Sequence, residues 1–212
     1  TGRVRVRELV SAYREHLKES GQLLEETFRH DRIITWDTHI EYKNCTAGRI
    51  VFCEGNGLKS NPFFNKLPLN GTKGELLTIH APDLKLEDVI KSAVFVMPLG
   101  EDLYKVGATF NWSDKTNIPS AEGRKELEDK LKTVITCDYK VVAHEAGVRP
   151  TTGDRRPLLG VHKDNHRLAL LNGLGTRGVM IAPLMAQKLY QFLENDQDLD
   201  QDIDIKRFKQ KN

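Results

Sequence analysis

The sequence predicts an α+β protein in which a mixed, largely antiparallel β-sheet is flanked by helices. Short runs rich in β-branched and aromatic residues, bounded by turn residues, predict strands along most of the chain. Two pairs of these runs are joined by short loops, as in β-hairpins. Apolar residues with helical spacing are confined to three segments. We therefore expect more strand than helix, with neighbouring strands mostly antiparallel.

The N-terminal quarter is predicted to contain a helix followed by short strands. Apolar residues recur three or four positions apart from Val6 to Leu17, and Gly21 stands where such a helix ends. A concentration of Asn, Gly and Pro between Gly55 and Gly74 predicts a long irregular loop. The strands expected between the helix and this loop are residues 23–28, 32–38 and 49–53, with a turn at 44–48.

The remainder is predicted to hold the two hairpins and two further helices. Ser120 precedes apolar Leu127 and Leu131, which predicts a helix that Ser120 caps. Residues 197–212 are polar, and we expect them to be extended. The other expected elements are strands 74–80 and 140–148, hairpins 93–97/103–109 and 157–161/167–171, a glycine loop at 173–178 and a last helix at 179–193.

Composition excludes several classes of protein. The 32 basic and 30 acidic residues give a net charge of +2, which is too small by itself to indicate a nucleic-acid or membrane surface and excludes neither acidic nor basic partners. No apolar stretch approaches the ~18 residues that span a bilayer. Three widely spaced cysteines indicate neither a disulfide framework nor a zinc ribbon, so we expect a reducing, cytoplasmic location. The start at Thr1-Gly2 without Met is typical of a piece of a longer protein.

The glycine loop matches the G-x-G-x-x-G pattern of dinucleotide-binding folds from Gly173 to Gly178, between a strand and a helix. That fold also needs a second parallel strand ending in an acidic residue roughly 20 positions on. Here that place is the polar end of a helix, at Glu194 to Asp196. We therefore reject the nucleotide-fold interpretation. Two interpretations remain: a tight strand-to-helix connection, or a helix start that receives negative charge.

Several motifs in order along the chain resemble one family. Residues 146–160, AGVRPTTGDRRPLLG, resemble the G-x-R-P-x-T-x-D-x-x-P-x-I-G signature of FAD-dependent oxidoreductases of the D-amino-acid oxidase and glycine oxidase type. Asn172 to Pro183 resembles that family's C-terminal flavin loop, and Lys206 to Phe208 its Arg-Phe ending. Lys73-Gly74-Glu75 and the hairpin with Pro98 and 106–109 also match.

The resemblance implies a flavoprotein that oxidises a C–N bond of an amino acid or amine by hydride transfer to FAD. It implies that the chain lacks the N-terminal FAD-binding unit, which leaves the fragment inactive alone. The three parts it implies are a junction with the FAD domain (1–55), a substrate-binding domain (56–145) and a flavin-contacting segment with the last helix (146–212). Glu54 departs from the small residue usual in the family strand at 50–55.

Arg149 is the main candidate for binding substrate. It ends a strand, Pro150 keeps it extended, and its guanidinium matches a carboxylate. The residues alone leave an ion pair with Asp154 or another acid as the alternative, whereas the resemblance assigns Arg149 to the substrate carboxylate. It also assigns Phe95 to the position where relatives use a tyrosine, so a bulkier amine, a modified nucleoside or a hydroxy acid stays open as substrate.

The cofactor is expected to be FAD, held noncovalently, because Gly147 occupies the position where some relatives attach flavin through Cys. Because hydride transfer needs no obligatory acid–base pair, we name no catalytic residue. The histidines show no metal-ligand spacing, and we assign no metal. On the resemblance, the residues assigned to the cofactor are His30, Gly55, Gly147, Gly173, Leu174, Gly175, Thr176, Arg177, Gly178, Val179 and Met180.

A second interpretation is a noncatalytic binding module that keeps the oxidase fold without FAD. Glu54 allows it, and a basic cluster of Arg155, Arg156, Lys163 and Arg167 offers a place for an anionic partner or is a solvated hairpin. As partners we expect a small molecule with a carboxylate or amine, neither nucleic acid nor membrane, and self-association through apolar surface left exposed.

Overall fold

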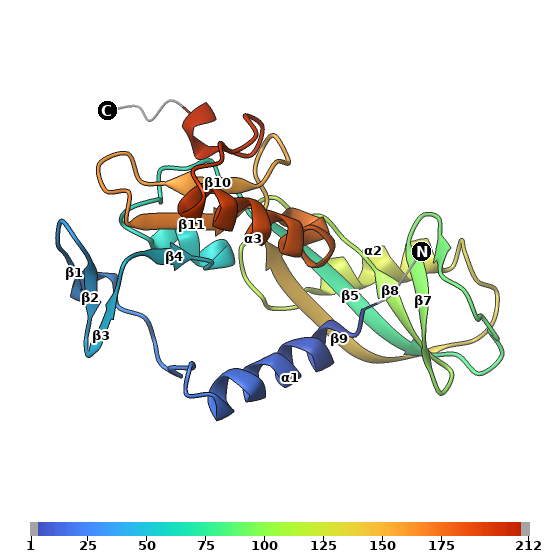
Figure 1. Ribbon diagram of the computed structural model, residues 1–212. Coiled ribbons are helices and arrows are strands. Elements are labelled where there is room, and N and C mark those ends of the chain that lie inside the picture. Colours follow the sequence, from blue (N-terminus) through green and yellow to red (C-terminus); the bar gives the residue numbers. More distant parts are fainter. Residues whose placement is uncertain (1–3, 209–212) are drawn as a thin grey trace.

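The computed structural model describes residues 4–208 and has the predicted α+β architecture (Figure 1). Its α-helices in this part of the chain are α1 (Val6–Glu19), α2 (Ala121–Leu131) and α3 (Gly178–Glu194). Short 3₁₀ turns occur at η1 (His30–Arg32), η2 (Gly55–Ser60), η3 (Gly175–Arg177) and η4 (Ile205–Arg207). The strands are β1 (Ile33–Thr35), β2 (Ile40–Tyr42), β3 (Cys45–Ala47), β4 (Ile50–Phe52), β5 (Thr72–His80), β6 (Ile90–Lys91), β7 (Phe95–Gly100), β8 (Leu103–Gly107), β9 (Lys140–Arg149), β10 (Leu158–Val161) and β11 (Leu168–Asn172).

The largest sheet has five antiparallel strands in the order β6-β7-β8-β5-β9. Helix α2 covers one of its faces, because Leu127 and Leu131 join Leu77, Val96 and Val106 in a buried core. Ser120 caps α2 as expected, since its Oγ accepts the Gly123 N–H at 3.0 Å. No helix of residues 4–208 contributes to a core on the opposite face, and the candidate site lies there.

The second sheet, β10-β11-β4, combines the predicted antiparallel hairpin with a parallel neighbour. Because β11 and β4 are parallel, their carboxyl ends lie side by side, which brings Asn172 next to Gly55: the Asn172 amide donates to the Gly55 carbonyl at 3.0 Å. Helix α3 packs on β10 through Met185 and Leu189. This sheet therefore gathers the ends of two segments that are more than 100 residues apart.

Two local predictions were wrong, and a third was incomplete. Residues 23–28 are not a strand; Phe28 simply packs against the core beside Tyr42, with ring centroids 4.4 Å apart. The expected turn at 44–48 contains β3, which pairs with β2. The loop at 55–74 is irregular, as expected, but it contains the 3₁₀ turn η2 and buries Leu58, Phe64 and Leu69. In each case long-range packing overrides the local pattern.

The two ends of the described chain also differ from expectation in how they pack. Helix α1 forms where predicted, yet it buries none of its side chains, and Leu9, Val10 and Tyr13 are more than half exposed. The C-terminal segment is not simply extended: Leu199, Ile203 and Ile205 are buried, and Asp204 pairs with Leu159 of β10. Residues 209–212 of the predicted extended tail lie outside the described residues.

Candidate functional site

Arg149 lies at the end of β9 on the sheet face that α2 does not cover. Side chains alternate along a strand, so Arg149 and Gly147 share this face with Gly74 of β5, which is directly opposite Gly147. The guanidinium folds back across Gly74: a Cβ on Gly74 would lie 2.0 Å from both Arg149 Nη atoms. Gly74 therefore has no side chain for a steric reason, because only glycine leaves room for Arg149 in this position.

The Arg149 guanidinium has no acidic partner among residues 4–208. It contacts the Thr109 carbonyl at 3.4 Å and lies over the Phe110 ring, 4.8 Å from the centroid. The residue is half-buried, and burial lowers the pKa of its guanidinium without bringing it near neutrality. A charge of this kind is suited to receive a carboxylate in the bidentate geometry that arginine offers.

The alternative ion pair between Arg149 and Asp154 is contradicted. Asp154 accepts instead from Arg207, whose Nε is 2.9 Å from Asp154 Oδ2. Arg207 is mostly buried and also donates to the Asp204 and Arg156 carbonyls. This pairing joins two of the motifs that were matched separately in the sequence, and it leaves Arg149 free for another anion.

The glycine loop is attached to the strand that carries Arg149. The Gly175 N–H donates to the Pro150 carbonyl at 3.0 Å, and Asn172 accepts from the Gly173 N–H at 2.7 Å. Gly173 and Gly175 have φ values of +69° and +58°, which favour glycine, and a Cβ on Gly173 would lie about 3.0 Å from Leu158. The start of α3 is thereby fixed close to the end of β9.

The rejection of a nucleotide-fold loop is consistent with the topology. After α3, the described chain makes one bridge to β10, between Asp204 and Leu159, and β10 is antiparallel to β11. No strand parallel to β11 follows α3 within residues 4–208, so the glycine loop is not part of a βαβ unit. The last helix begins at Gly178, one residue earlier than predicted.

The predicted site residues fall into three groups. Arg149, Gly147 and Phe95 share one face of the large sheet, although β8 and β5 separate Phe95 from Arg149. Gly55 and His30 lie near the end of β4, where His30 Nε2 is 2.6 Å from Glu54 Oε1. The structure attaches the glycine-loop group to the Arg149 group through Pro150, and to Gly55 through Asn172. The glycine-loop residues, which run from β11 through η3 into α3, are Gly173, Leu174, Gly175, Thr176, Arg177, Gly178, Val179 and Met180.

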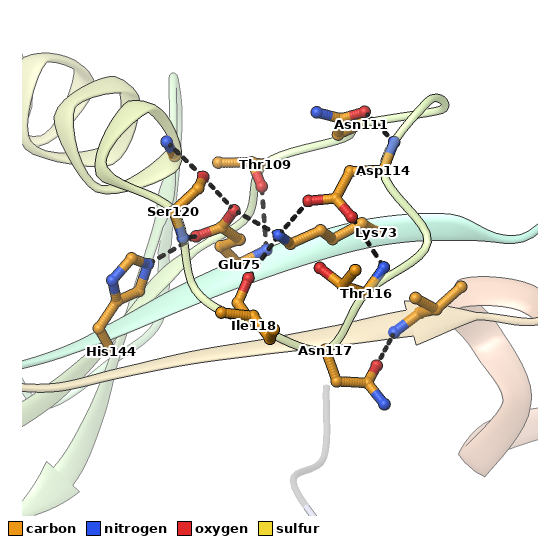
Figure 2. Close-up of polar contacts among 12 residues, drawn as sticks. Lys73, Glu75, Thr109, Asn111, Asp114, Thr116, Asn117, Ile118, Ser120 and His144 are labelled. Atoms are coloured by element: carbon orange, nitrogen blue, oxygen red, sulfur yellow. Dashed lines mark hydrogen bonds and ion pairs between the residues drawn. The ribbon is translucent and has the colours of Figure 1, made fainter.

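A buried polar cluster on the α2 side of the sheet was not predicted (Figure 2). It consists of Lys73, Glu75, Asp114, Ser120 and His144. Lys73 is 1% exposed; its Nζ donates to Asp114 Oδ2 at 2.5 Å and to the Ile118 carbonyl, and lies 3.4 Å from Glu75 Oε1. The Glu75 carboxylate accepts from the Ser120 N–H and Oγ, at 2.9 and 2.6 Å.

Electrostatics in this buried cluster favour charged side chains. The hydrogen bond from Lys73 lowers the pKa of Asp114 to about 2. Burial raises the pKa of Glu75, but the Ser120 hydrogen bonds and Lys73 outweigh burial, so that its pKa is lower than usual. His144 Nε2 lies 2.7 Å from Glu75 Oε2, although the ring is not oriented for a hydrogen bond. The sequence signal was Lys73-Gly74-Glu75, whose alternation puts two charges on one face and glycine on the other.

A comparison with known protein families shows to which family this chain is related. The FAD dependent oxidoreductase (DAO) family matches residues 1–191. The chain belongs to this family. Among curated members, glycine oxidase of Bacillus subtilis strain 168 is 28% identical over 147 residues, which cover 66% of this chain and 40% of that protein. The bifunctional protein MnmC of Marinobacter nauticus, named for tRNA 5-methylaminomethyl-2-thiouridine biosynthesis, is 28% identical over 163 residues, covering 69% of this chain and 26% of that protein.

Solved structures of the DAO family show the same fold at lower identity. Iminodiacetate oxidase of Chelativorans sp. BNC1 superimposes with a TM-score of 0.71 at 19% identity, covering 92% of this chain and 57% of that one. L-proline dehydrogenase of P. horikoshii has a TM-score of 0.72 at 14% identity, covering 90% and 56%. The match thus spans about half of each relative or less. No helix within residues 4–208 is both long and apolar enough to cross a membrane.

Two features of this DAO-family chain fit FAD, and one does not favour it. No heavy atom lies within 4 Å of a Cβ built on Gly147, so there is room above the sheet beside Arg149. The helix start at Gly178 supplies backbone N–H groups, with their partial positive charge, on the adjoining segment. Glu54, by contrast, places a carboxylate at the end of β4, where His30 and Asn61 bind it.

Proposed function

We propose that this chain is the substrate-binding part of a flavin-dependent oxidoreductase that oxidises a C–N bond of an amino acid or amine. The observation that carries the proposal is Arg149: a half-buried guanidinium that has no acidic partner within residues 4–208 and is folded over Gly74 on an open sheet face. Membership in the DAO family supports it, as do relatives named glycine oxidase and iminodiacetate oxidase. Bound FAD supplies the acceptor for the hydride that leaves the substrate carbon.

The residues of this chain bind and orient the substrate. Arg149 receives the carboxylate and thereby fixes the distance from the substrate's C–N bond to the space above Gly147. Holding the substrate in this position raises the rate of its oxidation. Phe110 lies against the guanidinium and limits how far it can swing. The helix start formed by Arg177, Gly178 and Val179 would hold the electron-rich edge of bound FAD, because its backbone N–H groups favour negative charge nearby. Gly147 offers no nucleophile, so FAD is held noncovalently.

The test measures flavin and substrate together in the protein with the sequence that flanks these residues in its gene. We expect a bound flavin spectrum that bleaches on anaerobic addition of glycine, iminodiacetate, proline or a related amine. Arg149→Met should raise the half-saturating concentration at least tenfold with the flavin spectrum unchanged. Arg124→Met, which removes an exposed arginine on α2, is the matched control and should bind substrate normally.

A second candidate is a noncatalytic binding module with the same fold. The observation that favours it is Glu54, whose two carboxylate oxygens are taken by His30 at 2.6 Å and Asn61 at 2.8 Å. The basic cluster gives it less support, because Arg156 pairs with Asp202 and Arg167 donates to backbone carbonyls of Asp37 and Gly48. Absence of flavin from the protein in the experiment above would contradict the oxidoreductase and favour this module.

A further inference from the structure

The segment that follows β8 exposes large apolar side chains, and one of them, Phe110, lies against Arg149. We call residues 109–119 the aromatic loop. Within it, Phe110 is 61% exposed, Trp112 50% and Ile118 69%. A cluster of this kind on a short segment is costly in water and marks a contact surface more often than chance exposure.

The aromatic loop is held rigidly by the buried cluster beneath it. Its Asn111 exchanges two backbone hydrogen bonds with Lys73, at 2.8 and 2.9 Å. The Lys73 side chain binds Asp114 and the Ile118 carbonyl, and the Glu75 carboxylate binds Ser120 at the end of the loop. Figure 2 shows these contacts converging on Lys73 and Glu75. The exposed aromatic rings are therefore presented in a fixed position.

Strand geometry places the Phe110 side chain on the Arg149 side of the sheet. Because Asn111 pairs with Lys73, its side chain belongs to the α2 face, and the preceding residue, Phe110, belongs to the opposite face. Trp112 follows Asn111, where the chain bends. The same antiparallel pairing puts Phe110 opposite Gly74, over which the Arg149 guanidinium lies. The 4.8 Å separation between that guanidinium and the Phe110 ring agrees with this placement.

We propose that Phe110 and Trp112 form the apolar wall of the Arg149 site, so that its substrate carries an apolar, preferably planar, group next to the carboxylate. This proposal rests on the proposed function, in which Arg149 binds a carboxylate. Arg149 offers a positive charge that attracts an anionic group, and the aromatic ring beside it offers an apolar surface. A ligand that fits both has a carboxylate at one end and an apolar group next to it. A substrate as small as glycine uses the arginine but leaves both rings in contact with water.

The experiment uses the two tryptophans of the chain, Trp36 and Trp112, as separate reporters. Trp36→Phe leaves Trp112 as the only tryptophan, and Trp112→Phe leaves Trp36, which lies between β1 and β2. Each variant of residues 1–212 is titrated with acetate and with phenylacetate, and tryptophan emission is followed. We expect phenylacetate to bind the Trp36→Phe variant about tenfold more tightly than acetate and to change Trp112 emission.

Two further substitutions in the Trp36→Phe background test separately the apolar wall and the anchor, which is the binding of the carboxylate by Arg149. Phe110→Leu keeps an apolar side chain but removes the ring, and should lower the affinity ratio of phenylacetate to acetate severalfold. Arg149→Met should abolish binding of both. In Trp112→Phe, the emission of Trp36 should not respond.

The outcomes distinguish the two proposals. Equal affinities for the two carboxylates, both dependent on Arg149, would overturn the apolar wall and leave the anchor intact. Binding of neither carboxylate would contradict both the anchor and the wall. A phenylacetate response from Trp36 as large as that from Trp112 would show nonspecific apolar binding and would also overturn the wall.

Discussion

Two charged sites on opposite faces of the five-stranded sheet are balanced in different ways. On the α2 face, Lys73 and Glu75 are almost fully buried, yet each charge is matched by hydrogen bonds and opposite charge. On the other face, the Arg149 charge has no acidic partner among the described residues. Gly74 lies between Lys73 and Glu75 in the sequence and belongs to the Arg149 face. The first set of charges stabilises the fold through these contacts, whereas for Arg149 we propose the substrate-binding role given above.

The largest expected difference between the faces is in stability. Glu75→Ala leaves Lys73 and the start of α2 without their buried partner and should lower the free energy of unfolding by about 3–5 kcal/mol. Arg149→Met removes a half-buried charge that forms no ion pair with the described residues, so the free energy of unfolding should change by no more than about 1 kcal/mol. Urea unfolding of both variants checks this. Glu75→Gln, which keeps the volume and some hydrogen bonds, should fall between them.

Equal losses of unfolding free energy for Glu75→Ala and Arg149→Met would contradict the distinction between the two sites. That result would mean that Arg149 also holds the fold together, for example by fixing the aromatic loop through Phe110. The substrate role of Arg149 would then need support from binding data alone.

The next effect concerns how the sheet positions Arg149. Gly74→Ala puts a Cβ where the guanidinium now lies, 2.0 Å from its Nη atoms, and must displace it. Carboxylate affinity should fall about tenfold or more, measured by the same acetate and phenylacetate titrations. Gly153→Ala is the matched control, because the nearest atom to its built Cβ is 4.0 Å away. Unchanged affinity in Gly74→Ala would show that Arg149 binds carboxylates in another rotamer.

Only part of this fold and of the candidate site could be predicted from the sequence. Patterns of local origin were predicted correctly: the Ser120-capped helix, both hairpins, and the extended Arg149 before Pro150. The family assignment came from ordered motifs and is confirmed over residues 1–191. The domain boundaries and the roles of the site residues stay predictions. Strand β3 was missed because all three of its residues are exposed, which leaves no alternation to detect.

The buried cluster escaped prediction for a different physical reason. Its hydrogen bonds join residues 41 and 45 positions apart, Lys73 to Asp114 and Glu75 to Ser120. Nothing in the local sequence around Asp114 distinguishes it from a surface aspartate, because burial of its partner arises only when the loop closes over β5. Likewise, the steric need for Gly74 depends on the Arg149 rotamer. Both facts follow from tertiary pairing, not from local pattern.

The smallest expected effect is the response to acid. Lys73 lowers the pKa of Asp114 to about 2, below its ordinary value of 3.8, so Asp114 stabilises the fold above about pH 4 and loses this contribution as the pH falls toward 2. Lowering the pH from 7 to 4 should leave Trp112 emission unchanged in the Trp36→Phe variant. Further acidification should release the loop and alter the emission.

Asp114→Asn removes the group that titrates and therefore provides the control. At pH 7 this variant should already show the altered Trp112 emission, and between about pH 4 and 2 it should change less than the parent. Arg149 stays charged over this whole range, so its own charge does not change while the buried cluster loses the charge of Asp114. A loop that detaches near pH 5 instead would mean that Lys73 does not hold Asp114, and that the aromatic rings are positioned from the Arg149 side.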